Sequence, residues 1–220
     1  MQKEIVLHSG ETREWVLLNE PEVDWHIVQE SGSALRLHIL CLPEGSAEVD
    51  SSRWQSHIVV EQNGTGCKTE LYGMGLLRGR QEMDVLTQVL HNVGGGYSSQ
   101  LFKYVLDGES RGVFKGELKI LPDAQKVEAH QTNRNILLSR QAQMTTEPQL
   151  EIYADDVKAS HGASTGQLDE SAIFYMQQRC IDKETAYKLL LCAFFDDVVG
   201  AVTDEGMQQQ LIDTINRIIQ

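Results

Sequence analysis

Short runs of alternating apolar and polar residues fill the first three quarters of the chain. Between residues 4 and about 161, runs such as Val23–Ile27 and Leu35–Cys41 place apolar side chains at every second position. Clusters rich in glycine, asparagine and aspartate separate these runs, which follow one another at spacings of about 8 to 15 residues. The pattern predicts short β-strands. By itself it fits a sandwich, a barrel or a β-solenoid, because no repeat of fixed length is visible.

The apolar period changes to 3.6 residues after Gly166, which predicts three helices. We therefore divide the chain into a β core, residues 1–166, and a C-terminal helical domain, residues 167–220. The second helix begins after the N-cap residue Asp182 and ends near Gly200, and the third begins after Asp204. The apolar residues expected to face inward are Leu168, Ala172, Ile173 and Met176 in the first helix and Met207, Leu211, Ile215 and Ile218 or Ile219 in the third.

The second helix has more apolar surface than one packing face requires. We expect its inner face to consist of Ala186, Leu189, Leu190, Ala193 and Phe194. A second stripe at i, i+4 spacing lies on the adjoining face and consists of Tyr187, Leu191, Phe195 and Val199. This second stripe predicts either a partner-binding surface or a contact that anchors the helices on the β core.

Composition narrows the classes of function. The 220 residues are 41% hydrophobic and carry a net charge of −13, with a pI near 4.9. So acidic a surface argues against nucleic acid or an anionic membrane as the main partner. No apolar run at the N-terminus predicts a signal peptide, and no stretch approaches the length of a membrane span, so we expect a cytoplasmic protein. The four cysteines are scattered, which argues against disulfides or a structural zinc site; we expect Cys192 and Cys180 to be buried.

Candidate chemistry concentrates just before the helices. His161 stands among small residues next to a glycine, where an imidazole ring can bind metal; a plain surface or helix-capping histidine is the alternative. Asp155 and Asp156 could bind a hard cation or form an acid–base pair, but neighbouring strand residues point to opposite faces, so a turn role is favoured. We expect structural roles for the remaining candidates, which are His91 and an amide stack of Asn133 with Asn135.

The stretch from Pro148 to Gly166 reads Pro-Gln-Leu-Glu-Ile-Tyr-Ala-Asp-Asp-Val-Lys-Ala-Ser-His-Gly-Ala-Ser-Thr-Gly. It resembles the signature of the SufB/SufD family of iron–sulfur cluster assembly scaffold proteins, and its Ser-His-Gly form is closest to SufD. Further matching motifs are Ser110-Arg-Gly-Val-Phe-Lys-Gly116, Ala124-Gln-Lys126, Gln131-Thr-Asn-Arg-Asn-Ile-Leu-Leu-Ser139 and Leu168-Asp-Glu with Ile173-Phe-Tyr175. They occur in the family's order, and the good match spans roughly residues 84 to 199.

The resemblance implies a mainly β fold, with a right-handed parallel β-helix core followed by a small α-helical bundle. It implies a non-enzymatic subunit of the SUF system that pairs with a SufB-like subunit, or with a second copy, through the end of the β-helix. The C-terminal helices would bind the SufC ATPase. Typical members carry a helical domain ahead of the β-helix, whereas the residues before the match are strand-like here, so we do not carry over that domain's functions.

The same resemblance makes His161 a candidate ligand of iron or of a transient iron–sulfur cluster at the partner interface, with no cofactor held stably by this chain alone. SufD-like sequences often have a cysteine where this chain has Ala159, so sulfur ligands are expected to come from elsewhere. The alternative from another class is a metal-dependent β-solenoid or β-sandwich enzyme that uses His161 with Asp155 or Asp156.

Overall fold

The computed structural model describes residues 2–42 and 51–219 and contains twelve strands followed by three helices. The strands are β1 (Lys3–Leu7), β2 (Thr12–Leu18), β3 (Glu22–Gln29), β4 (Ala34–Cys41), β5 (Arg53–Gln62), β6 (Lys68–Leu77), β7 (Glu82–His91), β8 (Tyr97–Leu106), β9 (Arg111–Ile120), β10 (Glu128–Leu137), β11 (Gln143–Ile152) and β12 (Lys158–Gly166). The helices are α1 (Glu170–Gln177), α2 (Lys183–Val199) and α3 (Glu205–Ile218).

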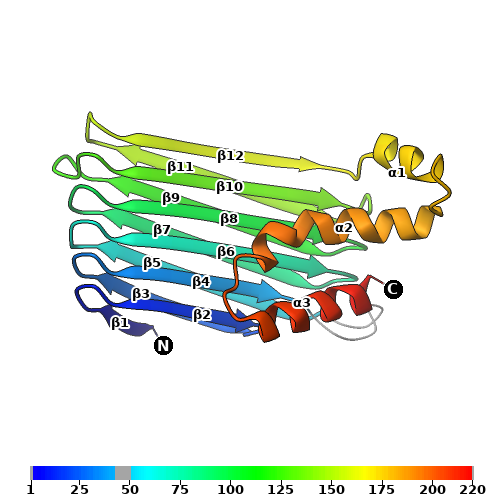
Figure 1. Cartoon of the computed structure of the whole chain (residues 1–220), viewed down its shortest axis with the longest axis horizontal. Coiled ribbons are helices and arrows are strands. Elements are labelled where there is room, and N and C mark those ends of the chain that lie inside the picture. The colour runs from blue at the N-terminus through cyan, green and yellow to red at the C-terminus, as the bar shows by residue number, and fades with distance from the viewer. Residues whose placement is uncertain (1, 43–50, 220) are drawn as a thin grey trace.

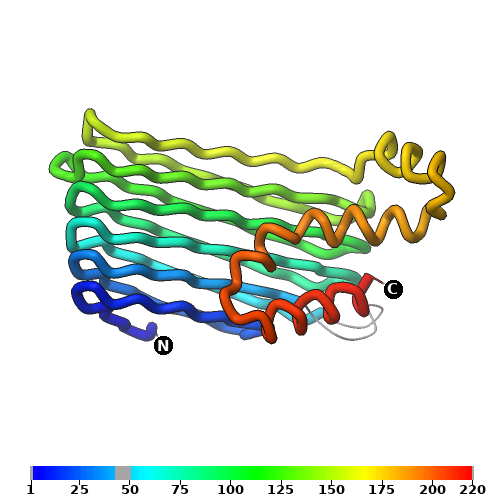
Figure 2. Tube along the Cα trace, viewed as in Figure 1, coloured from blue at the N-terminus to red at the C-terminus, as the bar shows by residue number. Residues whose placement is uncertain are grey.

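Successive strands alternate between two facing parallel sheets. Sheet A has the order β1-β3-β5-β7-β9-β11, and sheet B has the order β12-β10-β8-β6-β4-β2. Each coil of the chain therefore adds one strand to each sheet, and the coils stack from the N-terminal end to residue 166 (Figures 1 and 2). This arrangement is a β-solenoid, which confirms the fold expected from the family resemblance.

Unequal coil lengths explain why the sequence shows no repeat of fixed length. In sheet B, 22 residues separate Thr12 from its partner Ala34, and 34 residues separate Ala34 from Lys68. The next two steps, from Lys68 to Tyr97 and from Tyr97 to Glu128, take 29 and 31 residues. The strands keep in-register pairing while the turns between them absorb the difference.

The two sheets enclose a narrow core in which large rings lie over small residues. Tyr104, Phe102 and Phe114 are fully buried, and the last two stack with ring centroids 4.5 Å apart. Gly73 is the register partner of Phe102, and a Cβ at Gly73 would lie only 1.9 Å from the Phe102 ring. The missing side chain at Gly73 therefore makes room for that ring.

Helices α2 and α3 lie across the outer face of sheet B, while α1 lies beyond the ends of the strands (Figure 1). Asp182 and Asp204 are the N-caps, as predicted, and accept hydrogen bonds from the backbone N–H groups of Thr185 and Met207. In the described part of the chain, none of the three helices is long and apolar enough to cross a membrane.

The predicted packing of α3 and α1 is confirmed, whereas that of α2 needs correction in part. Leu211, Ile215 and Ile218 are buried in α3. In α2, however, Leu189 is 47% exposed and Ala193 is also exposed, so the expected inner face is wrong at these two positions, whereas Ala186 is buried as expected. In α1 the residues expected to face inward are less exposed than their neighbours, and Ile173 is buried, although this helix extends past the sheet that the others cover.

Two sets of polar interactions hold the helices on sheet B. Lys103 on β8 is only 4% exposed, and its Nζ lies 2.6 Å from the carbonyl oxygen of Phe194 and 2.6 Å from a carboxylate oxygen of Asp197, both on α2. On β2, the Glu14 carboxylate accepts hydrogen bonds from the backbone N–H and the hydroxyl of Thr203, between α2 and α3. Since a buried cation without partners would be costly, Lys103 fixes where α2 can lie.

Replacing Gly73 with alanine tests the narrow interior. The added methyl group must displace the Phe102 ring, so the free energy of unfolding should fall by about 1–3 kcal/mol. Gly162 provides a matched control, because a Cβ there meets no atom within 4 Å. Urea unfolding followed by circular dichroism should show a clear loss for Gly73→Ala and a change within about 0.5 kcal/mol for Gly162→Ala. Equal effects would contradict the tight packing at Gly73.

Candidate functional site

The solenoid is open at its last coil. Strand β11 stands at the edge of sheet A and β12 at the edge of sheet B, and within the described residues no strand pairs with their outer edges. Both edges lie at the same end of the molecule (Figure 1). Nearly every residue of β12 is exposed, in contrast to the alternating burial of β8 and β9. The final coil thus presents two unpaired backbone edges and the interior between them.

His161 lies in the middle of β12, at this open end. Its register partner on β10 is Gln131, which is 1% exposed and points into the solenoid opposite Gly116 of sheet A. Paired residues of parallel strands point to the same face, so His161 also points inward. It is exposed because β12 belongs to the last coil of the described chain.

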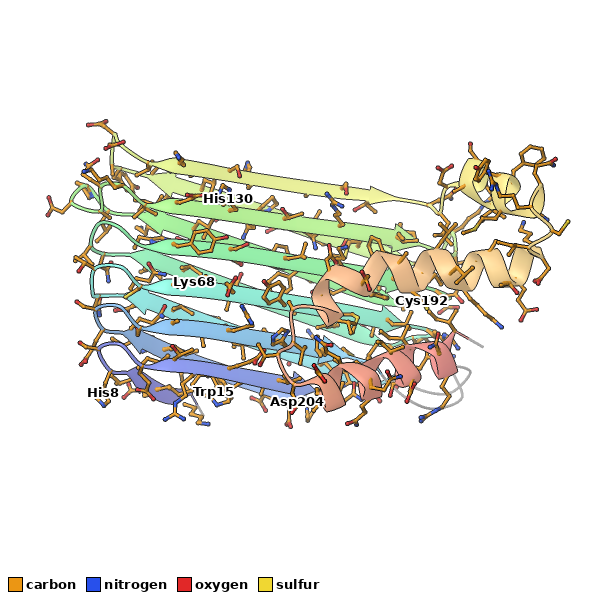
Figure 3. The ribbon with its side chains drawn as sticks, viewed as in Figure 1. His8, Trp15, Lys68, His130, Cys192 and Asp204 are labelled. Carbon is orange, nitrogen blue, oxygen red and sulfur yellow. The ribbon has the colours of Figure 1, made fainter. Side chains whose placement is uncertain are left out.

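The outer face beside His161 carries a hydrogen-bonded trio that the sequence analysis missed. Ser160 Oγ lies 2.8 Å from His130 Nδ1, and His130 Nε2 lies 3.0 Å from a carboxylate oxygen of Glu128. The hydrogen bond with His130 lowers the pKa of Glu128. Figure 3 labels His130 on β10, one strand below β12. The trio is exposed to solvent and ties β12 to β10, and only the register could have revealed it, because Ser160 is 30 residues from His130.

The acidic pair that the alternative enzyme hypothesis combines with His161 lies elsewhere. Asp155 and Asp156 occupy the bend between β11 and β12, where the backbone N–H of Asp156 donates to Gln125 Oε1. His161 is the fourth residue of β12, so the three side chains are not brought together. Across residues 2–42 and 51–219, no three histidine, cysteine or acidic side chains form a group that could hold a metal ion. The turn role expected for the two aspartates fits their position.

Polar residues of the interior have the structural roles expected of them. Asn133 and Asn135 are buried, and Asn135 Nδ2 donates to Asn133 Oδ1 over 2.6 Å. His91 is fully buried with Nε2 2.8 Å from Ser98 Oγ, and burial lowers the pKa of its ring to about 4. His91 is therefore neutral at pH 7 and cannot serve as an exposed ligand.

Most of the predicted partner-binding stripe is buried within this chain. Leu191, Phe195 and Val199 are at most 5% exposed and pack with apolar residues on the outer face of sheet B; Tyr187 is half-buried beside them. Of the two alternatives, the structure uses the stripe to anchor the helices. The large apolar residues exposed on the described helices are instead Phe174 and Tyr175 on α1, Leu189 on α2 and Ile212 on α3.

The cysteines also differ from expectation. Cys180 is exposed and Cys192 is half-buried, with its Sγ 3.4 Å from Asn216 Oδ1, whereas Cys41 and Cys67 are buried. None of these thiols lies on the last coil, and Ala159 occupies the position next to Ser160. Thiolate ligands for a metal ion bound at His161 would therefore have to come from outside the described residues.

Comparison with known proteins identifies the family. A sequence model described as "SUF system FeS cluster assembly, SufBD core domain" matches residues 27–194. The chain belongs to the SufBD family. The match includes the solenoid from the end of β3 onward and most of α2, so the open last coil and His161 both lie within the family's core domain.

The curated relatives of this SufBD protein include SufD proteins. The iron–sulfur cluster assembly protein SufD of Escherichia coli is 36% identical over 155 residues, which cover 70% of this chain and 37% of that protein. SufD of Bacillus subtilis is 33% identical over 162 residues (69% and 37%), and the chloroplastic protein ABCI7 of Arabidopsis thaliana is 34% identical over 155 residues (70% and 33%). The chain therefore spans about a third of the length of these relatives.

Replacing Phe195 with alanine should show whether the buried stripe anchors the helices of this SufBD protein. Removing a fully buried ring should lower the free energy of unfolding by about 3–5 kcal/mol. Leu189→Ala, on the exposed side of the same helix, should change it by less than about 0.5 kcal/mol. Denaturant unfolding together with limited proteolysis of the helices measures both effects. If the two variants behave alike, the stripe is not packed on the solenoid in solution.

Proposed function

We propose that this chain is a SufD-like, non-catalytic scaffold subunit of the SUF iron–sulfur cluster assembly machinery. In this role it pairs with a SufB-like subunit, or with a second copy, through the last coil of the solenoid. His161 then supplies one ligand to iron or to a nascent cluster at the junction, and the C-terminal helices bind the SufC ATPase. The single observation that carries the proposal is the position of His161 on the open, unpaired edge of a SufBD core.

The open edges favour pairing with another chain. Unpaired backbone N–H and C=O groups along a strand readily add a further strand. The exposed edges of β11 and β12 are ten and nine residues long, whereas those at the opposite end, β1 and β2, have five and seven residues. The last coil therefore offers the longer template for pairing with a similar solenoid.

His161 is better suited to a metal site shared with a partner chain than to a metal site formed by this chain alone. An imidazole nitrogen is a good ligand for iron, but one histidine cannot hold a cluster. The described part of the chain contributes no thiol near His161, so a partner must provide the remaining ligands. The cluster is thus a cargo that forms only in the assembled complex.

The helices offer a different surface to the ATPase from the one the sequence suggested. Phe174 is 62% exposed, Tyr175 57% and Leu189 47%, and large apolar side chains this exposed favour a protein contact. Because Leu191, Phe195 and Val199 are already buried, we place the SufC contact on the exposed residues of α1 and α2.

Blocking the edge of β12 tests the pairing. Since Lys158 donates its N–H to the carbonyl oxygen of Val127, directly before β10, the N–H groups of the alternate residues such as Ala163 face the open edge. Ala163→Pro removes one of these donors, so association with the partner should weaken roughly fivefold or more while the melting temperature barely changes. Ala163→Ser keeps the N–H and should associate normally.

Analytical ultracentrifugation at micromolar concentration, with and without a SufB-like subunit, measures this association. We expect the wild-type chain alone to sediment as a dimer. A strict monomer that also ignores the SufB-like subunit would refute pairing through the last coil.

Replacing His161 with alanine tests the ligand role. An exposed histidine contributes little to stability, so the variant should fold and bind its partner nearly as well as the wild type. Cluster build-up in the assembled complex, followed by visible absorbance and iron content, should nevertheless be lost. His8→Ala is the matched control, because His8 is exposed at the opposite end of the solenoid (Figure 3). Wild-type rates of cluster formation in His161→Ala complexes would show that His161 is not a ligand.

A further inference from the structure

A buried amide directly beneath His161 has no hydrogen-bonding partner. Both Nε2 and Oε1 of Gln131 are shielded from solvent, and neither bonds to any atom of the described residues. Leaving a buried polar group unpaired costs about 1–3 kcal/mol. We therefore expect this amide, which lies on a strand of the family's core domain, to form a hydrogen bond with another group.

Gln131 belongs to an inward-facing polar column that ends at His161. Gln100 on β8, Gln131 on β10 and His161 on β12 are register partners on successive strands. Gln100 Oε1 accepts a hydrogen bond of 2.6 Å from Thr87 Oγ1 in sheet A, while Gln100 Nε2 is also buried without a partner. Opposite Gln131 stands Gly116, where a Cβ would lie 1.9 Å from Gln131 Nε2. The glycine leaves room for the amide between the two sheets.

The spacing between β10 and β12 allows a side-chain hydrogen bond from one strand to the next. Four residues further along the same two strands, Asn135 and its register partner Thr165 bond through Nδ2 and Oγ1 over 3.1 Å. The pair Gln131 and His161 has the same register and the same inward direction, with longer side chains. His161 is exposed and no described strand lies beyond β12, so the ring can turn toward the amide.

We propose that Gln131 is the positioning residue of His161: its side-chain oxygen accepts a hydrogen bond from the ring nitrogen that faces the solenoid interior. Gln131 Nε2 then donates to Gln100 Oε1, which has a second lone pair, so both ends of the Gln131 amide are satisfied. The role of this hydrogen bond in metal binding rests on the function proposed above, whereas the hydrogen bond itself does not.

The chemical consequence concerns which ring nitrogen carries the proton. A neutral imidazole that donates from its inner nitrogen keeps a lone pair on the outer nitrogen. That lone pair faces the open end, where a metal ion shared with a partner would bind. Histidines that bind metals commonly donate their other N–H to such an acceptor, which fixes both tautomer and ring orientation. Gln131 would do the same here before any metal arrives.

The tautomer of His161 can be measured directly in the chain without metal. In long-range ¹H–¹⁵N NMR spectra of ¹⁵N-histidine-labelled protein at a pH where the ring is neutral, the His161 signal is assigned by its loss in His161→Ala. We expect the tautomer ratio of the wild type to differ roughly five- to tenfold from that of an unbonded histidine ring, the change that one net hydrogen bond produces. Gln131→Met removes the acceptor at similar volume and should return the ring to the unbonded ratio, whereas Gln131→Glu keeps an acceptor and should restore the wild-type ratio.

Gln149→Met is the matched control, because Gln149 is exposed on the other sheet of the last coil, and it should leave the tautomer unchanged. A wild-type ring with the tautomer ratio of an unbonded histidine in water would show that water rather than His161 satisfies Gln131, and would overturn the proposal even if Gln131→Met fails to fold. An unchanged preference in folded Gln131→Met would overturn it as well.

The outcome separates this inference from the ligand role of His161. Loss of cluster build-up in His161→Ala with no effect of Gln131→Met on the tautomer leaves the proposed function standing and rejects the positioning role. A shifted tautomer in Gln131→Met with normal cluster build-up in His161→Ala supports the positioning role and rejects the ligand role.

Discussion

In-register backbone pairing between successive coils is the constraint on which the rest of this structure depends. Each inner strand satisfies its N–H and C=O groups with the coil before it and the coil after it. The strands of the final coil have only one neighbour, so the fold itself creates two unpaired edges at the end of the stack. The same pairing also keeps side chains in register over long sequence distances, which is how residues 30 positions apart come into contact.

The narrow space between the sheets limits which side chains each coil can bury. In the middle coils, rings such as Phe102 and Phe114 fill this space, and Gly73 accommodates them. Toward the last coil the inward residues of sheet B become amides, including Gln131 and Asn133, and finally an imidazole. A polar interior is poorly suited to stabilising a free end by apolar burial, but it is suited to an end that meets a partner or binds an ion.

The helices are fixed by the outer face of sheet B, not by each other alone. The buried Lys103 bridges β8 and α2, Glu14 holds the connection before α3, and the stripe around Phe195 fills the space between these ties. Because anchoring uses that stripe, the opposite side of α2 and most of α1 are left exposed. The surface available to a partner protein is therefore set by how the helices dock on the solenoid.

Much of this protein follows from the sequence alone. Alternating apolar positions predict the strands, and the aspartate caps at Asp182 and Asp204 predict where two helices begin, because both signals are local. The motif around His161 indicates the family, and the family indicates the solenoid, which strand periodicity could not distinguish from a sandwich because coil lengths vary. The inward pairing of Asn133 and Asn135 was predictable from their spacing on one strand.

Only the tertiary structure decides the face of α2 that packs, since two apolar stripes of similar character compete and the position of Lys103 selects one. It alone brings His130 to Ser160, and Gln131 beneath His161, since these contacts depend on the number of residues in the turn between strands. The tertiary structure likewise separates Asp155 and Asp156 from His161, because the two aspartates lie in the bend before β12 and His161 lies within that strand. Strand periodicity and helix caps can be recognised along the sequence, because they involve neighbouring residues. The register between strands and the docking of the helices on sheet B depend on distances that only the folded chain defines.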